Sequence, residues 1–420
     1  MKEPASRGLR HNSRPMAGRD PGETHRVATS LELLFDLTFA TSFGFAASCL
    51  ANALAAGHDA AALLGFGFAS FAICWAWINF SWFSSAYDTD DSVFRIVTLV
   101  QMVGVLVLAA GLPRLFSSIE RSGHLDNSVM VLGYVVMRLA LVFQWLRAAR
   151  DDLPRRRVCL TYAATISLAQ VGWVVLIAVP LASIHAIVLG GSLALVEMTG
   201  PVLAERQAGG TPWHAHHIAE RYSLFAIIAL GEGVVGTVAA LSAVADRQGW
   251  TIDTVLVGTA GMGLTFGMWW LYDLVPSAEV LNRHRDRAWV WSLFQMLIVT
   301  SIVATGAGLR VAADFIGHKS RMTAAATVLT VAVPVSIFLV LLHALYGYLV
   351  RRFRPFDAGL LFTSGAVAIL AVVAALSGIR LIVCFLILMF APAVTVIAYE
   401  VMGYRHPATR PEANVLEGHA

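Results

Sequence analysis

The chain has 420 residues, of which 57% are hydrophobic and 14% are charged. Soluble globular proteins carry about 25% charged residues. The deficit extends over the whole length and the mean hydropathy is +0.69. This composition excludes an ordinary soluble protein and predicts a polytopic membrane protein.

About twenty consecutive apolar residues cross the hydrocarbon core of a bilayer as a helix. On that measure the sequence predicts an all-α membrane protein of about twelve transmembrane helices. We expect these helices at residues 31–55, 60–86, 92–116, 127–148, 158–179, 182–200, 217–243, 252–275, 288–311, 322–350, 357–377 and 379–402. Residues 1–28 are polar and rich in Arg, Gly and Pro, which predicts a disordered tail. No cleavage site precedes the first apolar stretch, so we expect an uncleaved helix rather than a signal peptide.

The basic residues predict the orientation. With the N-terminus inside, most Lys and Arg residues fall on the cytoplasmic side, including clusters at residues 155–157 and 351–354. The positive-inside rule therefore predicts cytoplasmic N- and C-termini. Such clusters suit lipid headgroups better than nucleic acid, so the bilayer is the expected partner and nucleic acid is not. The oligomeric state is left open.

Three segments of the first half recur weakly in the second. Residues 32–37, 75–80 and 100–103 resemble residues 220–225, 268–273 and 294–297. The offsets of 188, 193 and 194 residues equal six helices, which predicts a 6+6 parallel repeat as in some transporters; chance similarity of apolar helices is the alternative. The predicted organisation is a cytoplasmic tail (1–28), a six-helix half (29–203), a linker (204–216), a second six-helix half (217–403) and a cytoplasmic tail (404–420).

Several motifs share their order with a known family. They are residues 31–39, 87–95, 137–139, 217–225, 230–232 and 269–273, followed by Gly306-x-Gly308. Together, over about residues 28–402, they resemble the bacterial low-temperature-requirement A (LtrA) family. Ser223 and Ser292 depart from the pattern, where the family usually has Gly and commonly His. The resemblance implies a multi-pass protein of the bacterial cytoplasmic (inner) membrane, associated by name with growth in the cold, and supplies no substrate.

Glu232 is the most informative polar residue, because it lies in the middle of an apolar stretch at residues 222–241. An ionised acid at the bilayer centre costs roughly 2.5–3.5 kcal/mol on insertion scales. Arg138 lies at a comparable predicted depth, and a guanidinium cannot shed its proton. We predict that Arg138 pairs with Glu232, or failing that with Asp36. A structural ion pair and a proton or substrate site are both open.

Gly231 and Gly233 flank Glu232, and Gly236 follows. Small residues allow two helices to pack closely. They also permit local unwinding, which in transporters exposes backbone groups to the substrate. The sequence does not decide between these alternatives.

Acidic residues near predicted helix ends indicate an inward access path. Its candidates are Glu32, Glu197 and Asp273, with Asp36 adjoining. Thr29 and Glu32 also match a capping box, whereas Asp36 lies one turn deeper and requires a polar cavity or partner. Glu197 and Asp273 lie in the last turns of their predicted helices, where a carboxylate opposes the helix dipole; a wet interface is the alternative.

An acidic loop precedes the third predicted helix. Its carboxylates can cap that helix, with Asp91 pairing Arg95 at i,i+4. A cytoplasmic latch between helices is the alternative, and calcium binding is disfavoured because the Gly and terminal Glu of an EF-hand loop are missing. The candidate latch residues are Asp88, Asp90, Asp91, Arg95, Glu220 and Arg221.

Other chemistry is weakly indicated. The four cysteines lie singly in apolar runs, and His214, His216 and His217 have no companion ligand spacing, so no metal site is expected. No nucleophile elbow, Walker loop, dinucleotide fingerprint or zincin motif lies on a suitable element. We therefore expect no catalytic residues, no cofactor and no enzyme activity.

These observations favour a transporter or permease-like protein, coupled to protons or cations through Glu232, Arg138 and Asp36. Its substrate would be an unidentified small molecule or ion. The alternative is a non-transporting membrane sensor or scaffold that supports envelope function and growth in the cold.

Overall fold

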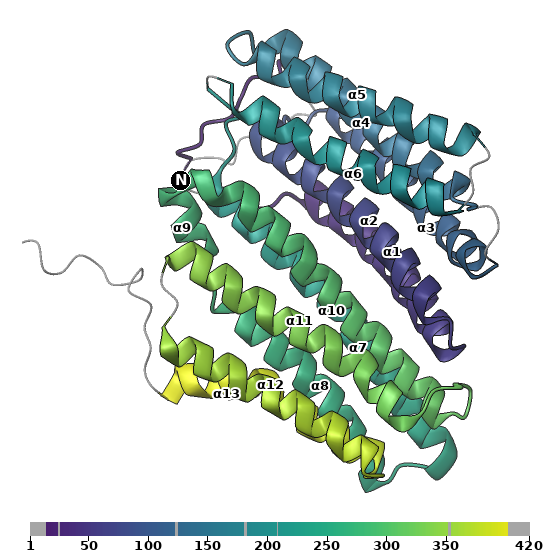
Figure 1. Cartoon of the computed structure of the whole chain (residues 1–420). Helices are drawn as coiled ribbons and strands as arrows, with labels where there is room; N and C mark the ends of the chain where they lie inside the picture. The colour runs from purple at the N-terminus through teal and green to yellow at the C-terminus, as the bar shows by residue number, and fades with distance from the viewer. Residues whose placement is uncertain are drawn as a thin grey trace, which may run out of the picture. The chain divides into compact units, whose positions relative to one another are not determined.

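The computed structural model describes residues 14–23, 26–121, 125–179, 183–207, 209–351 and 354–401. Within these ranges the secondary structure is helical and contains no strand (Figure 1). The helices are α1 (Ser30–Ala55), α2 (Asp59–Tyr87), α3 (Ser92–Glu120), α4 (Ser128–Asp151), α5 (Arg156–Ala178), α6 (Ser183–Glu205), α7 (Ala215–Gln248), α8 (Ile252–Asp273), α9 (Ser277–Arg283), the 3-10 helix η1 (Arg285–Arg287), α10 (Ala288–Ile316), α11 (Ala324–Val350), α12 (Pro355–Leu376) and α13 (Leu381–Val401).

Twelve helical segments in the described chain are long and apolar enough to cross a membrane. The eighth joins α8 with α9, and the ninth joins η1 with α10. Large apolar side chains such as Leu168 and Phe362 are exposed on the helix surfaces, as expected of faces that contact lipid. The predicted all-α membrane protein with about twelve spans is confirmed, whereas the 6+6 repeat stays a prediction.

Several helix boundaries differ from the prediction, and those around α6 and after α8 are the clearest. α6 continues through Pro201 to Glu205, although Gly200-Pro201 suggested an end at residue 200. Proline is tolerated inside membrane helices because neighbouring groups satisfy the backbone that it frees. The segment between the eighth and ninth predicted spans, expected as a loop, contains α9 and η1.

Local sequence explains several helix ends. Thr323 caps α11 by accepting a hydrogen bond from the Ala326 N–H at 3.2 Å, and Pro355 begins α12, where its missing N–H costs nothing. Gly249 after α7 and Gly378 after α12 have φ angles of 70° and 79°. This left-handed conformation favours glycine and ends a helix.

Close contacts divide the chain into two compact units. Unit 1 comprises Met1–Phe39, Ala76–Gly111 and Gly123–His214, and unit 2 comprises Ala40–Trp75, Leu112–Ser122 and Ala215–Ala420. The predicted halves, 29–203 and 217–403, differ from these units, because α1, α2 and α3 each contribute residues to both. Residues 404–420, the predicted cytoplasmic C-terminal tail, lie outside the described residues, as do residues 1–13, 24 and 25.

In unit 1, α5 packs against both α4 and α6 (Figure 1). A Cβ added to Gly133 of α4 would lie 2.3 Å from the backbone N of Leu108 in α3, so these two helices approach closely through glycine. The Trp145 ring stacks on Tyr162 of α5 with centroids 4.1 Å apart. Glycine contacts and aromatic packing therefore hold the unit together.

In unit 2, α10 packs between α7 and α11, and α13 packs against α8 and α12 (Figure 1). The α7–α10 contact is close, since a Cβ added to Gly236 would lie 2.5 Å from the carbonyl O of Gly306. This backbone approach positions the charged residues of both helices.

Candidate functional site

A partly buried ion pair lies within the spans of unit 2. Glu232, near the middle of α7, is 9% exposed, and its Oε2 accepts a hydrogen bond from Arg310 Nη2 of α10 at 2.6 Å. Arg310 Nη1 also donates to the Ser48 hydroxyl of α1 at 2.8 Å. Each charge thus has an opposite charge, which lowers the cost of keeping it among apolar helices.

Glycines bring these helices to that distance. A Cβ added to Gly306 of α10 would lie 2.5 Å from the carbonyl C of Glu232, and one on Gly44 of α1 would lie 3.2 Å from Glu232 Oε1. A Cβ on Gly233 would lie 2.6 Å from Thr265 Oγ1, whereas Gly231 has nothing within 4 Å. α7 is continuous through Glu232. Gly306, Gly44 and Gly233 therefore serve close packing, whereas Gly231 does not, and the helix is not unwound there.

A second buried charge pair lies in unit 1. Arg138 of α4 and Glu197 of α6 have side chains that are 2% and 0% exposed, with Arg138 Nη2 3.5 Å from Glu197 Oε2. Glu197 Oε1 accepts hydrogen bonds from Gln170 Nε2 at 2.8 Å and Trp173 Nε1 at 3.2 Å, and its Oε2 accepts one from the Tyr134 hydroxyl. Three neutral donors thus hold this carboxylate.

The predicted Arg138–Glu232 pair is wrong. Arg138 pairs with Glu197 of its own unit, and Glu232 pairs with Arg310. The second candidate, Asp36, is likewise not the partner of Arg138. Glu197 also does not lie in a last helical turn, because α6 continues to Glu205. The extra helical length places this carboxylate inside the span.

The acidic residues of α1 have distinct surroundings. Glu32 forms the predicted capping box, in which its Oε2 accepts the Thr29 N–H at 2.9 Å and Thr29 Oγ1 accepts the Glu32 N–H at 3.3 Å. Asp36, fully buried, accepts a hydrogen bond from Trp77 Nε1 at 2.7 Å. Glu32 therefore has a structural role, and Asp36 has the polar partner that its depth requires.

The loop between α2 and α3 connects elements of unit 1. Asp91 accepts the Phe94 N–H at 2.8 Å and Arg147 Nη1 at 3.1 Å. Arg95 pairs instead with Asp90, with Nε 2.9 Å from Oδ1. The predicted Asp91–Arg95 pair is wrong, because the Asp91 carboxylate caps α3 through the Phe94 N–H and takes Arg147 of α4 as its cationic partner.

Two carboxylates of this loop have opposite pKa shifts. Burial, followed by the like charge of Glu32, raises the pKa of Asp88 to about 6. Burial also acts to raise the pKa of Asp91, but the hydrogen bonds from Arg147 and two backbone N–H groups outweigh it and lower that pKa to about 2. The loop therefore favours the ionised form of Asp91 and the neutral form of Asp88.

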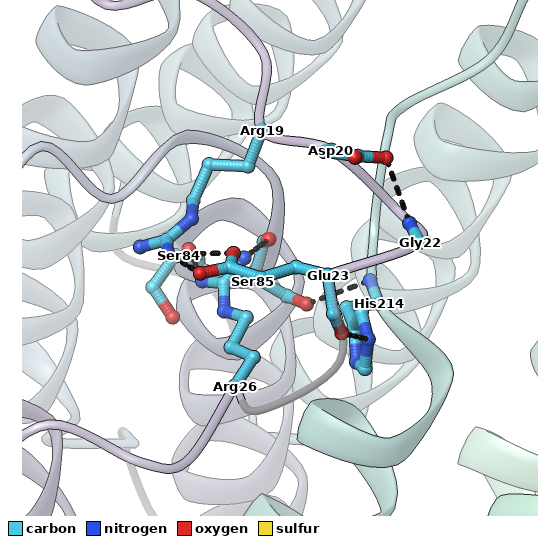
Figure 2. Close-up of polar contacts among 8 residues, drawn as sticks. All are labelled: Arg19, Asp20, Gly22, Glu23, Arg26, Ser84, Ser85 and His214. Carbon is cyan, nitrogen blue, oxygen red and sulfur yellow. Dashed lines mark hydrogen bonds and ion pairs between the residues drawn. The ribbon is translucent and has the colours of Figure 1, made fainter.

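The N-terminal segment is ordered in its described part, residues 14–23 and 26–29, which we call the N-terminal strap. Met16 is fully buried and its N–H donates to Asp151 of α4 at 2.8 Å. Figure 2 shows Arg26 directed at the carbonyl groups of Ser84 and Ser85 at the end of α2. The predicted disorder does not hold here, because these polar groups find fixed partners at the helix ends.

The strap also contacts the segment that precedes α7. His214 Nε2 donates to the carbonyl O of Glu23 at 2.7 Å, and its backbone N–H donates to Ser85 Oγ at 3.1 Å (Figure 2). Burial lowers the pKa of Arg26 to about 10. The guanidinium remains charged at neutral pH and can hold the strap by charge-assisted hydrogen bonds.

The remaining candidates are dispersed. Asp273 ends α8 and is exposed, Arg221 is fully buried in α7, and Glu220 is half-buried beside it. His217 is buried whereas His216 is exposed. Across the described ranges no three His, Cys, Asp or Glu side chains form a group that could hold a metal ion.

Sequence reasoning missed the residues that complete both charge pairs. Arg310 counted as a basic residue at the end of a shorter predicted helix, but α10 extends to Ile316. If the predicted helix is extended to Ile316, Arg310 lies inside the span and is recognisable as a second charge there. Gln170 carries a weaker signal of the same kind, as a polar residue in an apolar helix.

The fold and these buried charge pairs define a polytopic helical membrane protein. Residues 27–397 match the family described as Bacterial low temperature requirement A protein (LtrA). The chain belongs to this family, as the motifs indicated. It is also 26% identical over 293 residues to Uncharacterized protein RA0937 of Rhizobium meliloti (strain 1021), which covers 66% of this chain and 67% of that protein. No solved structure matches the chain.

Proposed function

We propose that this protein is a transporter or permease of the bacterial cytoplasmic membrane, coupled to protons or cations. The observation that carries the proposal is the Glu232–Arg310 pair inside two apolar helices of unit 2. Charged groups within membrane spans are costly and commonly belong to ion or substrate pathways. The substrate would be a small molecule or ion, and both termini would face the cytoplasm.

The coupling step would be protonation of Glu232. A neutral carboxyl no longer attracts Arg310, so the contact of α7 with α10 loses its electrostatic contribution. Arg310 would then retain Ser48, its other hydrogen-bond partner. A proton can shift the equilibrium between inward- and outward-facing arrangements only if it stabilises one of them more than the other. Loss of the Glu232–Arg310 ion pair would supply that difference in free energy.

The other predicted site residues receive different roles. Glu32 closes a capping box and Glu197 is held by three neutral donors. We therefore assign both to structure and keep Asp36 and Asp273 as candidates for an inward access path. Arg138 would stabilise unit 1, and the α2–α3 loop would act as a cytoplasmic latch through Asp91 and Arg147.

Flux through proteoliposomes tests the proposal. Purified protein should move protons, reported by an enclosed pH-sensitive dye, when the correct compound from a broad metabolite panel is added. Glu232→Gln should abolish this flux while the protein remains folded and abundant. Glu279→Gln, which changes an exposed carboxylate on α9, is the matched control. Absence of both proton-linked flux and ligand-induced stabilisation across the panel would end the proposal.

A non-transporting sensor or scaffold is the second candidate. The observation in its favour is that Glu232 and Glu197 each have a cationic partner, as purely structural charges would. Under this function, growth in the cold should decline in step with the amount of folded protein in every variant. A Glu232→Gln protein that is folded but inactive would favour the transporter instead. Neither candidate includes a catalytic step, a cofactor or nucleic acid.

A further inference from the structure

A cavity in unit 2 lies apart from the Glu232–Arg310 pair. Side chains of α8, of the two residues that follow it, and of α11 and α13 surround it, and α13 packs against both α8 and α11. Its walls are largely apolar, with Leu271, Leu274 and Leu342 among them. The space measures about 430 Å³, a figure that includes open solvent at its mouth, so the enclosed part has room only for a small ligand.

One polar side chain in this wall is a buried histidine. His343 of α11 is 5% exposed, and its Nδ1 lies 2.8 Å from the carbonyl O of Leu339 on the same helix. A carbonyl oxygen can only accept, so Nδ1 carries the hydrogen, and in the neutral ring Nε2 is then an acceptor. Nε2 is on the other side of the ring, away from that backbone bond. It has no hydrogen-bond partner in the described part of the chain.

Neighbouring polar groups already have partners. The Tyr399 hydroxyl donates to Asp357 Oδ1 at 2.9 Å, and the Thr395 and Ser364 hydroxyl groups lie 3.2 Å apart within hydrogen-bond distance. Asp357 also accepts the Arg354 N–H at 3.1 Å. His343 Nε2 is therefore the acceptor in this wall that has no partner in the described chain; the wall also carries the hydroxyl groups of Tyr346, Tyr399 and Thr395. A metal ion is disfavoured, since one imidazole supplies only one of the usual four ligands.

We propose that this cavity binds a small, mainly apolar molecule of about one ring that carries a single hydroxyl or N–H donor. The apolar walls would bury the ring, and the donor would bond to His343 Nε2. An unpaired buried acceptor discriminates strongly between a ligand that donates and an analogue that does not. The site therefore selects for the donor and not for size alone.

A matched pair of probes tests the donor requirement. Cyclohexanol and cyclohexyl methyl ether share a ring, but only the alcohol donates. Saturation-transfer NMR on the full-length protein in nanodiscs should give a signal for cyclohexanol at least about fivefold stronger than for the ether, with empty nanodiscs subtracted. Equal signals from the two probes would overturn the proposal, and this comparison needs no variant.

Variants then locate the site. His343→Phe keeps a ring but removes the acceptor, and should abolish the preference for the alcohol. His185→Phe, at an exposed position on α6, should retain it. Val275→Phe fills the cavity from its wall while His343 remains, and should reduce binding of both probes. Full alcohol preference in folded His343→Phe protein, or undiminished binding of both probes to folded Val275→Phe protein, would place the site elsewhere and contradict the proposal.

Discussion

Arg310 Nη2 lies 2.6 Å from Glu232 Oε2, and the two residues are 78 positions apart in the chain. Both belong to helices whose other residues are mostly apolar. Because the two charges compensate one another, each lowers the free-energy cost of keeping the other inside the span. This pair, and not an Arg138–Glu232 pair, is the relationship on which the proposed coupling depends.

The first prediction concerns the dependence between paired charges. Glu232→Gln or Arg310→Gln alone should lower the free energy of unfolding by about 1–3 kcal/mol, because each removes one charge from a largely buried pair whose arginine side chain is 23% exposed. The double variant should lose less than the sum of the two single losses. Thermal unfolding followed by tryptophan fluorescence measures all three.

The same cycle on Arg138 and Glu232 is the control. Each of these residues has its own partner, so their losses should add to within about 0.5 kcal/mol. Coupling between Arg138 and Glu232, with additivity between Glu232 and Arg310, would contradict the Glu232–Arg310 and Arg138–Glu197 pairs.

The second prediction concerns the close approach of α7 and α10. Gly306→Ala would place a Cβ 2.5 Å from the Glu232 carbonyl C, so the helices must separate. Overpacking of this kind costs typically 1–3 kcal/mol, and the Glu232–Arg310 bond should weaken with it. Gly231→Ala is the matched control, since nothing lies within 4 Å of its Cβ position. Equal melting temperatures for the two variants would contradict the close contact.

The third prediction concerns the carboxylate of Glu197. Tyr134→Phe removes a hydroxyl donor from a buried acceptor, which should cost about 1–3 kcal/mol of unfolding free energy. Tyr348→Phe, at a half-buried tyrosine on α11, should change stability by less than about 0.5 kcal/mol. If the two substitutions change the unfolding free energy equally, the Tyr134 hydroxyl does not stabilise the Glu197 carboxylate.

The fourth prediction concerns pH. The pKa of Asp88 is raised in the folded state from 3.8 to about 6, so its neutral form is favoured there. Its contribution to stability is present below pH 3.8 and is lost as the pH rises through about 6, a change of about 3 kcal/mol. Asp88→Asn should abolish this loss and raise the melting temperature at neutral pH.

Two neighbouring groups provide the controls for that measurement. Asp91, with a pKa lowered to about 2, stabilises the fold above pH 3.8, and that contribution is lost as the pH falls through 2. Its window therefore lies below that of Asp88. Asp90→Asn changes an exposed carboxylate of the same loop and should retain most of the slope between pH 4 and 6, because the charge of Asp90 is the smallest of the causes that raise the pKa of Asp88. A wild-type slope in Asp88→Asn would remove Asp88 as its cause.

The candidate site was partly accessible from sequence. Glu232 and Arg138 stand out because a charge in an apolar stretch is conspicuous in the sequence. Glu32 and Thr29 predict their own capping box, since both partners lie within one helical turn. The predicted counter-ions of Glu232 and Arg138 are wrong. The predicted helix boundaries place Arg310 at a helix end and Glu197 in a last turn, so neither residue counts as a charge inside a span. Both errors came from helices that extend further than their apolar residues indicate.

The amino-acid sequence by itself determined the class of protein, the number of spans and the family. These follow from local properties, namely the length of each apolar stretch and the order of its motifs. Only the tertiary structure decided which charges meet, why Gly306 must be small and that the strap at residue 26 is ordered. The physical reason is that partner choice depends on which helices are neighbours and how each is rotated, and the hydropathy of a single helix contains neither.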